Sequence, residues 1–353
     1  MISVNIGNMI CQKVDVFICF VRAPSAILSY LCLNIKQISH LQYNKSQVKA
    51  GMPPKRKTQR RRQRRNPPDP GPKVCSPLMA KTRQSKSCLP SHVLQKISIK
   101  TRKKYGGSSN TNILKKQLAL DLGCSTNDEK CIIEKSALSY KEKKALLNTF
   151  FRPPMPDEWK RDPDMWLNSD DITKVMKQYE QAYPEFKFLG VVPIDFSAPD
   201  PYTETERKCM NDQFCHVDLK EEVANGRRIL GAVFNLDPHY KDGSHWVALA
   251  IDLKRLCVYY FDSYGMPPPP QVARFMRYLT LQNPGLRLQS NGRRFQYGDS
   301  ECGMYSLYFI IRMIAGESFK KFCKMPIADK YMLSFRKILF DANAHKVLPV
   351  NDK

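Results

Sequence analysis

The sequence predicts an α+β fold for residues 153–353, with a central mixed sheet flanked by helices. Two neighbouring apolar runs, His245–Ile251 and Leu256–Phe261, have the length and composition of buried strands and are separated by a short polar turn. A third apolar stretch, Gly303–Ala315, ends at Gly316, which is typical of a buried helix and its stop residue. Helices and strands mixed in this order indicate an α+β domain.

The remaining elements of this domain follow from periodicity. Asn168 or Ser169 is expected to cap a helix whose apolar residues recur at helical spacing: Ile172, Val175, Met176 and Tyr179. Phe186–Phe196 and Ile229–Leu236 are strand candidates. The proline run 267–270 leads into a further helix with Val272, Phe275, Met276 and Leu279 on one face.

Residues 87–152 are expected to form a small helical domain of unassigned function. Asn112–Leu122 has an amphipathic pattern that ends at Gly123, and Ser125–Phe151 continues with apolar residues among Lys and Glu. The proline-rich segment 153–156 then predicts a linker into the α+β domain.

Residues 52–86 are predicted to be a disordered basic arm. From Met52 to Lys104 the chain has 17 Lys and Arg against the single acid Asp69, which is 17 − 1 = +16 of its net charge of +24. Such a segment cannot bury enough apolar surface to fold. Its candidate nucleic-acid contacts, through phosphates, are Lys55, Arg56, Lys57, Arg60, Arg61, Arg62, Arg64 and Arg65. A solvated tail or a nuclear-import signal is the alternative.

Residues 1–51 are apolar but show no clear helical or strand period. Polar residues and Pro24 interrupt Val14–Leu33, so no membrane span is expected, although a weak anchor is an alternative. The segment also lacks the basic start and cleavage site of a signal peptide. Because Met52 before the basic arm resembles a natural start, we expect residues 1–51 to be disordered or a non-native upstream extension.

Four residues in three consecutive motifs have the types that a thiol peptidase requires: His245, Asp262, Gln296 and Cys302. A cysteine attacks as the thiolate, so it needs an imidazole to take its proton and a third group to orient that imidazole. Cys302 lies at a predicted helix N-terminus, where the helix dipole favours a thiolate. His245 and Asp262 lie on neighbouring predicted strands, and Gln296 can donate to an oxyanion.

Each of these residues also has a structural interpretation. His245 could be a hydrogen-bonded strand residue, and Cys302 could be a small buried hydrophobe, as is expected of Cys257. Asp262 could cap the following turn, and Gln296 could be a solvated loop amide. Their order and spacing together favour the catalytic interpretation.

The 12 cysteines are scattered without a regular framework, which favours a reducing compartment. Cys124 and Cys131 are seven residues apart, and Cys209, Cys215 and His216 have no second close pair. We therefore expect no metal site. A thiol peptidase also needs no cofactor.

At these motifs the chain resembles the cysteine proteases of the SUMO-protease (Ulp-like) and adenovirus-proteinase superfamily. The matching residues are His245-Trp246, Asp262-Ser263, Gln296, Cys302-Gly303 and Trp166-Leu167-Asn168, over roughly residues 160–340. Glu301 departs from the Asp that usually precedes the nucleophile in cellular SUMO proteases. Ser-Glu-Cys-Gly-Met is more similar to the capsid-maturation proteases of large cytoplasmic DNA viruses.

The resemblance implies a papain-like or Ulp-like core and a cleft in which Trp246 and Trp166 restrict the residues before the cut, although either Trp could instead be core. The viral resemblance implies cleavage after Gly-Gly or Ala-Gly in structural polyproteins, in the virion and host cytoplasm. The cellular resemblance implies processing of a ubiquitin-like modifier and a nuclear location. A basic nucleic-acid packaging protein with an inactive protease fold is a further alternative. The sequence does not predict the oligomeric state.

Overall fold

The computed structural model describes residues 3–6, 9–13, 17–23, 26–31, 75–80, 87–101, 110–199 and 209–342. The chain divides into two compact units, Met1–Arg64 and Arg65–Lys353. The first unit contains an antiparallel sheet of order β1-β2-β3-β4, with strands β1 (Ser3–Ile6), β2 (Met9–Lys13), β3 (Phe17–Ala23) and β4 (Ala26–Leu31). The prediction of disorder for residues 1–51 is therefore wrong for these strands. They are rich in Ile, Val and Phe, which favour strands even where no alternation is visible.

A five-stranded mixed sheet forms the centre of the second unit. Its order is β5-β6-β7-β8-β9, with strands β5 (Phe186–Pro193), β6 (Ile229–Asn235), β7 (Trp246–Asp252), β8 (Cys257–Phe261) and β9 (Arg287–Ser290). The outer pairs are parallel and the inner pairs antiparallel. The predicted α+β fold is confirmed. Strand β9 was not predicted, because its four residues are all exposed and carry no apolar pattern.

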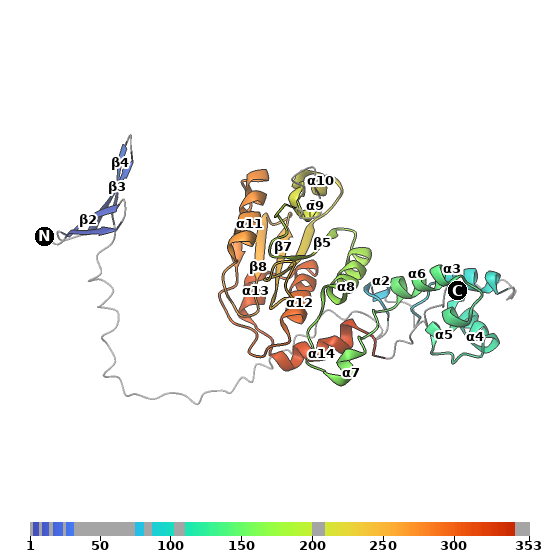
Figure 1. Cartoon of the computed structure of the whole chain (residues 1–353). Coiled ribbons are helices and arrows are strands. Elements are labelled where there is room, and N and C mark those ends of the chain that lie inside the picture. Colours follow the sequence, from blue (N-terminus) through green and yellow to red (C-terminus); the bar gives the residue numbers. More distant parts are fainter. Residues whose placement is uncertain are drawn as a thin grey trace, which may run out of the picture. The chain divides into compact units, whose positions relative to one another are not determined.

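Helices cover both faces of this sheet (Figure 1). Alternate residues of β7 point to opposite faces, so Ala248 and Leu249 belong to different hydrophobic cores. One core includes residues of α8 (Ser169–Ala182), α12 (Cys302–Ile314), α13 (Phe319–Lys324) and α14 (Asp329–Leu339), as well as Trp159 of the short helix α7 (Glu158–Arg161). The other includes residues of α9 (Asp212–Cys215), α10 (Leu219–Ala224) and α11 (Pro270–Gln282). Burial on both sides explains why β7 is continuously apolar.

Five helices of the described chain precede this core and share a separate apolar cluster. They are α2 (Pro77–Ala80), α3 (Ser91–Lys100), α4 (Thr111–Asp121), α5 (Glu129–Lys135) and α6 (Tyr140–Phe150). Residues 75–80 belong to this cluster, although the sequence analysis placed them in the disordered arm 52–86. Cys75 is fully buried in the cluster, and its backbone forms an isolated antiparallel β-bridge with Phe151. The Ser76 N–H donates to the Phe150 carbonyl at 2.9 Å. The basic residues Lys55–Arg65 lie outside the described residues.

The helical cluster is attached to the α+β core by buried polar contacts. The Gln178 side chain on α8 donates to the carbonyls of Asn148, at 2.9 Å, and Phe151, at 2.6 Å. Lys130 of α5 forms an ion pair with Asp341, near the end of the described chain. The Asp341 backbone also pairs with the proline-rich linker, since its N–H donates to the Pro153 carbonyl at 2.8 Å.

Among the described residues, six cysteines are paired in three disulfides: Cys75–Cys88, Cys124–Cys131 and Cys209–Cys215. Their Cα separations of 5.2, 5.8 and 6.4 Å lie in the range that a disulfide requires. Their irregular spacing did not reveal these pairs, because the fold brings together residues that are 6 to 13 apart in sequence. Cys257, Cys302 and Cys323 are free. In the described part of the chain, no helix has the length and apolarity to cross a membrane.

Candidate active site

His245 and Asp262 meet at one end of the central strand pair. β7 and β8 are antiparallel, with Ala248 opposite Phe261, so the start of β7 lies beside the end of β8. His245 directly precedes β7, and Asp262 directly follows β8. The His245 Nε2–H donates to Asp262 Oδ1 at 2.7 Å, and both side chains are buried. The predicted neighbouring strands thus bring the predicted base and orienting carboxylate together.

Cys302 is the first residue of α12 and is buried, with 1% of its surface exposed. Its side chain interacts with the His245 imidazole closely enough to raise the pKa of that group. Since Nε2 is bonded to Asp262, Nδ1 is the nitrogen left to exchange a proton with the thiol. The dipole of the 13-residue helix α12 places positive potential at the sulfur. The three side chains therefore form one connected series of thiol, imidazole and carboxylate.

The protonation of His245 reflects these contacts. Burial alone would lower its pKa, but the hydrogen bonds to Asp262 and Cys302, and the charges of these two groups, raise the pKa from 6.5 to about 9. The imidazole therefore holds its proton strongly at neutral pH. A group in this state can stabilise a thiolate beside it and donate a proton to a leaving amine.

Asp262 is fixed by backbone donors and by a residue that sequence reasoning missed. The N–H groups of Tyr264 and Met266 donate to its carboxylate at 2.8 and 3.3 Å. The Asp262 N–H donates to Asn291 Oδ1 at 2.9 Å, and Asn291 Nδ2 donates to the Asp262 carbonyl at 2.6 Å. Asn291 follows the exposed strand β9, so no apolar pattern in the sequence indicates that its side chain is buried.

Gln296 is fully buried, in the loop before α12. Its carbonyl oxygen accepts from the Ser263 hydroxyl at 2.7 Å, which sets the orientation of the amide. Its Nε2 donates to the Gly298 carbonyl at 2.9 Å and lies 3.5 Å from the Tyr264 hydroxyl, a distance at which a hydrogen bond is weak. The interpretation of Gln296 as a solvated loop amide is therefore wrong. One N–H of a buried, oriented amide remains weakly engaged and can serve a substrate oxygen.

The loop that carries Gln296 is held by Asp329, a residue that lies outside the predicted motifs. Asp329, the first residue of α14, accepts from the N–H groups of Tyr297 and Gly298 at 2.9 and 2.8 Å. The Tyr305 hydroxyl of α12 donates to the same carboxylate at 2.7 Å. Asp329 therefore connects the loop to the helix that starts at Cys302. An aspartate at a helix start is an ordinary capping pattern, so the sequence offers no signal for this contact.

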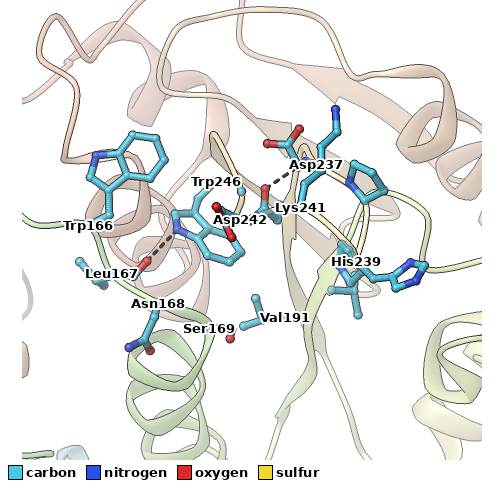
Figure 2. A pocket seen from close by; sticks show the side chains of 15 residues that line it. Trp166, Leu167, Asn168, Ser169, Val191, Asp237, His239, Lys241, Asp242 and Trp246 are labelled. Carbon is cyan, nitrogen blue, oxygen red and sulfur yellow. Dashed lines mark hydrogen bonds between the residues drawn. The ribbon is translucent and has the colours of Figure 1, made fainter.

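A cleft of about 470 Å³ opens beside this series of side chains. Figure 2 shows Trp166, Leu167 and Asn168 on one side of the cleft, Asp237, Lys241 and His239 on the other, and Trp246 between them. The full lining is Trp166, Leu167, Asn168, Ser169, Val191, Val192, Pro193, Asn235, Asp237, Pro238, His239, Lys241, Asp242, Gly243 and Trp246.

The two tryptophans have different environments. Trp166 is 38% exposed, which contradicts the alternative that it is a core residue. Trp246 is 8% exposed and belongs to the buried core as well as to the cleft wall, and its indole N–H donates to the Leu167 carbonyl at 2.9 Å. This hydrogen bond joins the segment Trp166–Asn168 to the start of β7, the two segments predicted to flank the cleft.

Two residues of the cleft wall, Leu167 and Trp246, pack against Gly303 at the start of α12. A Cβ at this position would lie 3.1 Å from the Leu167 Cβ and 3.3 Å from Trp246 Cδ1, so the glycine allows the cleft wall to approach the residue that follows Cys302. The cleft wall is therefore adjacent to the residue that follows Cys302. No group of three or more His, Cys, Asp or Glu side chains suited to a metal occurs in the described ranges.

Comparisons with known proteins agree with this geometry. Residues 229–348 match the model of the Ulp1 protease family, C-terminal catalytic domain. The chain is 30% identical over 192 residues to R355 of Acanthamoeba polyphaga mimivirus, which is named as a thiol protease; the match covers 52% of this chain and 59% of R355. It is 28% identical over 245 residues to a protein of African swine fever virus that is named as a SUMO-1 cysteine protease, covering 62% of this chain and 84% of that protein.

The fold has an experimental counterpart. The crystal structure of the African swine fever virus protease aligns with a TM-score of 0.52 and 23% identity, over 76% of this chain and 95% of that one. Likeness at this identity shows the fold, and the sequence matches carry the family assignment. The chain therefore contains a cysteine protease catalytic domain of the Ulp1 family.

Proposed function

We propose that this protein is a cysteine endopeptidase that cleaves after small residues, at Gly-Gly or Ala-Gly sites, and processes viral structural polyproteins during virion maturation. The observation that carries the proposal is the position of Cys302, which begins α12 beside the His245–Asp262 pair, and the residue after His245, Trp246, lines a cleft. The mimivirus and African swine fever virus relatives, both named as proteases, support the viral role. The proposal includes a location in the virion and host cytoplasm.

The catalytic cycle follows from the contacts. Cys302 attacks the scissile carbonyl as the thiolate, while the proton remains on His245, and the carbonyl becomes a tetrahedral oxyanion. The Gln296 amide and the Cys302 backbone N–H stabilise this oxyanion. His245 then donates its proton to the leaving amine, and a thioester remains on Cys302. Water hydrolyses the thioester with His245 as base, while Asp262 holds the imidazole throughout.

The cleft supports a preference for small residues before the cut. Trp246 is pinned to the Leu167 carbonyl, so this wall cannot swing aside for a larger side chain. Gly303 brings the same wall against the start of α12. Glycine or alanine suits a passage bounded in this way, because larger side chains would have to displace a buried indole.

A fluorogenic peptide with Gly-Gly or Ala-Gly before the fluorophore tests the proposal. The wild-type protein should release the fluorophore, and Cys302→Ala should not. Absence of release with both peptides, under reducing conditions that keep Cys302 as a thiol, would contradict the proposed function. Because the African swine fever virus relative is named as a SUMO-1 protease, a fusion to a ubiquitin-like modifier ending in Gly-Gly should be compared. Faster cleavage of the fusion than of a polyprotein-type peptide would favour modifier processing.

A further inference from the structure

Three exposed or half-buried side chains form a stack against the catalytic imidazole. The Tyr264 ring stacks on His245, with ring centres 4.7 Å apart and an interplanar angle of 23°. The Arg294 guanidinium lies 5.1 Å from the centre of the Tyr264 ring and 5.0 Å from that of Tyr297. Arg294 is exposed, and Tyr297 is 73% exposed. We call Tyr264, Arg294 and Tyr297 the Tyr–Arg stack.

The Tyr–Arg stack is held in place by its backbone. Gly265 has φ +78°, and a Cβ there would lie 2.8 Å from the Arg293 backbone carbon, so the loop after β8 can pack against residues 293–294. Arg294 Nε donates to the Gln296 carbonyl at 2.6 Å. Asp329 fixes the Tyr297 N–H. An exposed surface that is already ordered loses little entropy when a ligand binds.

The stack is separate from the cleft lining. The cleft is formed by residues 166–169, 191–193, 235, 237–239, 241–243 and 246, and no member of the stack lines it. A substrate whose acyl half occupies the cleft must continue past His245, which donates the proton to the leaving amine. Tyr264 covers that imidazole. The segment after the scissile bond therefore meets the Tyr–Arg stack.

The distances limit which substrate residues can reach Arg294. The separations of 4.7 and 5.1 Å place its guanidinium within about 10 Å of the His245 ring. At ~3.3 Å per residue of extended chain, this corresponds to about three residues after the cut. Tyrosine and arginine are also the residue types that dominate binding energy at protein surfaces.

The charge of Arg294 indicates the side chain that it would bind. Its Nε is used by Gln296, and no acid within the described residues forms an ion pair with it. Arg293 beside it is exposed and adds positive charge, while Asp299 is the acid on the same loop. A guanidinium with two free nitrogen groups is suited to bidentate binding of a carboxylate. We propose that the Tyr–Arg stack binds the first three or so residues of the leaving segment and favours an acidic side chain among them.

This inference rests on the proposed protease function. Two types of substrate distinguish a failure of the inference from a failure of that function. Both carry the same acyl segment, Gly-Gly or Ala-Gly, whichever the wild-type protein cleaves. One ends in a coumarin amide with no residues after the cut. The other continues with a three-residue segment in which each position in turn is Glu or Lys. Arg294→Ala is compared with Arg293→Ala, a matched control whose Nη1 donates to the Lys324 carbonyl instead.

The wild-type protein is expected to prefer Glu to Lys about fivefold in kcat/KM at one of the three positions, the size of one partly exposed ion pair. Arg294→Ala should abolish this preference and leave coumarin release unchanged, and Arg293→Ala should keep most of it. Equal rates for Glu and Lys in the wild type would overturn the inference. The inference would also be overturned if Arg294→Ala lowered the rate of coumarin release as much as it lowered cleavage of the extended peptides. Arg294 would then act on catalysis through Gln296. Failure of the wild type on all substrates would remove the proposed function itself.

Discussion

Asn291 and Asp262 exchange two hydrogen bonds, each using the side-chain amide of Asn291 and the backbone of Asp262. The carboxylate that orients His245 is therefore fixed through its own main chain, at the point where β8 ends. Asn291 is 2% exposed, so neither of these bonds competes with bulk water.

Replacing Asn291 with Ala should shift Asp262 and lower kcat/KM roughly tenfold to a hundredfold, the effect of a small misplacement of a catalytic group. A merely structural effect would lower the unfolding temperature without moving the pH profile. We also expect the alkaline limb of the pH profile of kcat/KM to move to lower pH, because a displaced Asp262 would raise the pKa of His245 less. Asn225→Ala, at the exposed end of α10, is the control and should leave both quantities unchanged.

The activity of the wild-type protein should fall as the pH rises through about 9. His245 has a pKa raised from 6.5 to about 9, so it remains protonated, as the leaving amine requires, until that range. Because the folded-state pKa is the higher one, its contribution to stability is complete below pH 6.5 and is lost as the pH rises through about 9. A pH series of kcat/KM tests this prediction, and in Asp262→Asn the fall should begin at lower pH. A fall that began at the same pH in this variant would contradict the assigned cause.

Alkylation should distinguish Cys302, which is buried, from Cys323, the half-buried free thiol. Burial raises the pKa of Cys323 to about 11, so it reacts slowly at pH 7. Iodoacetamide is therefore expected to modify Cys302 first and to abolish turnover in step with that modification. Cys323→Ala should remain fully active, whereas Cys302→Ala and His245→Ala should be inactive with unchanged circular dichroism. Inactivation that followed Cys323 modification would contradict the nucleophile assignment.

Gln296→Ala should lower kcat roughly a hundredfold with little change in KM, the usual result of losing one oxyanion donor. Ser263→Ala should give a smaller loss in the same direction, because Ser263 only orients the Gln296 amide. Steady-state kinetics on one peptide can compare the two variants. A loss confined to KM would assign Gln296 to substrate binding.

The basic arm gives a prediction that is independent of catalysis. Deleting residues 52–72 should weaken nucleic-acid binding and flatten its dependence on salt, because each lost phosphate contact removes released counterions. Turnover of a short peptide should not change, since the four candidate catalytic residues lie beyond residue 240. An undiminished salt slope in the truncated protein would place the binding surface elsewhere.

The parts of the site that were predictable lie in apolar segments. His245 and Asp262 sit at the ends of two buried strands, and Cys302 begins a buried helix, so periodicity located all three. Asn291 and Asp329 were not predictable, because each makes its contact through a polar side chain in a segment without an apolar period. The cysteine pairs were missed for a related reason, since Cα separation depends on chain reversals such as the turn at Gly123 between α4 and α5. The sheet β1–β4 lacks the alternation that usually reveals strands.

The contacts of Gln178 have a consequence for how the protein can be divided. One end of α8 begins at the cleft residues Asn168 and Ser169, and Gln178, further along the helix, donates to carbonyls of the helical cluster. A fragment cut at the proline-rich linker would keep every candidate catalytic residue yet leave this buried amide without its two acceptors. The boundary that sequence composition suggests is therefore a poor place to truncate, and the helices before it act as a structural brace for the helix that begins at the cleft wall.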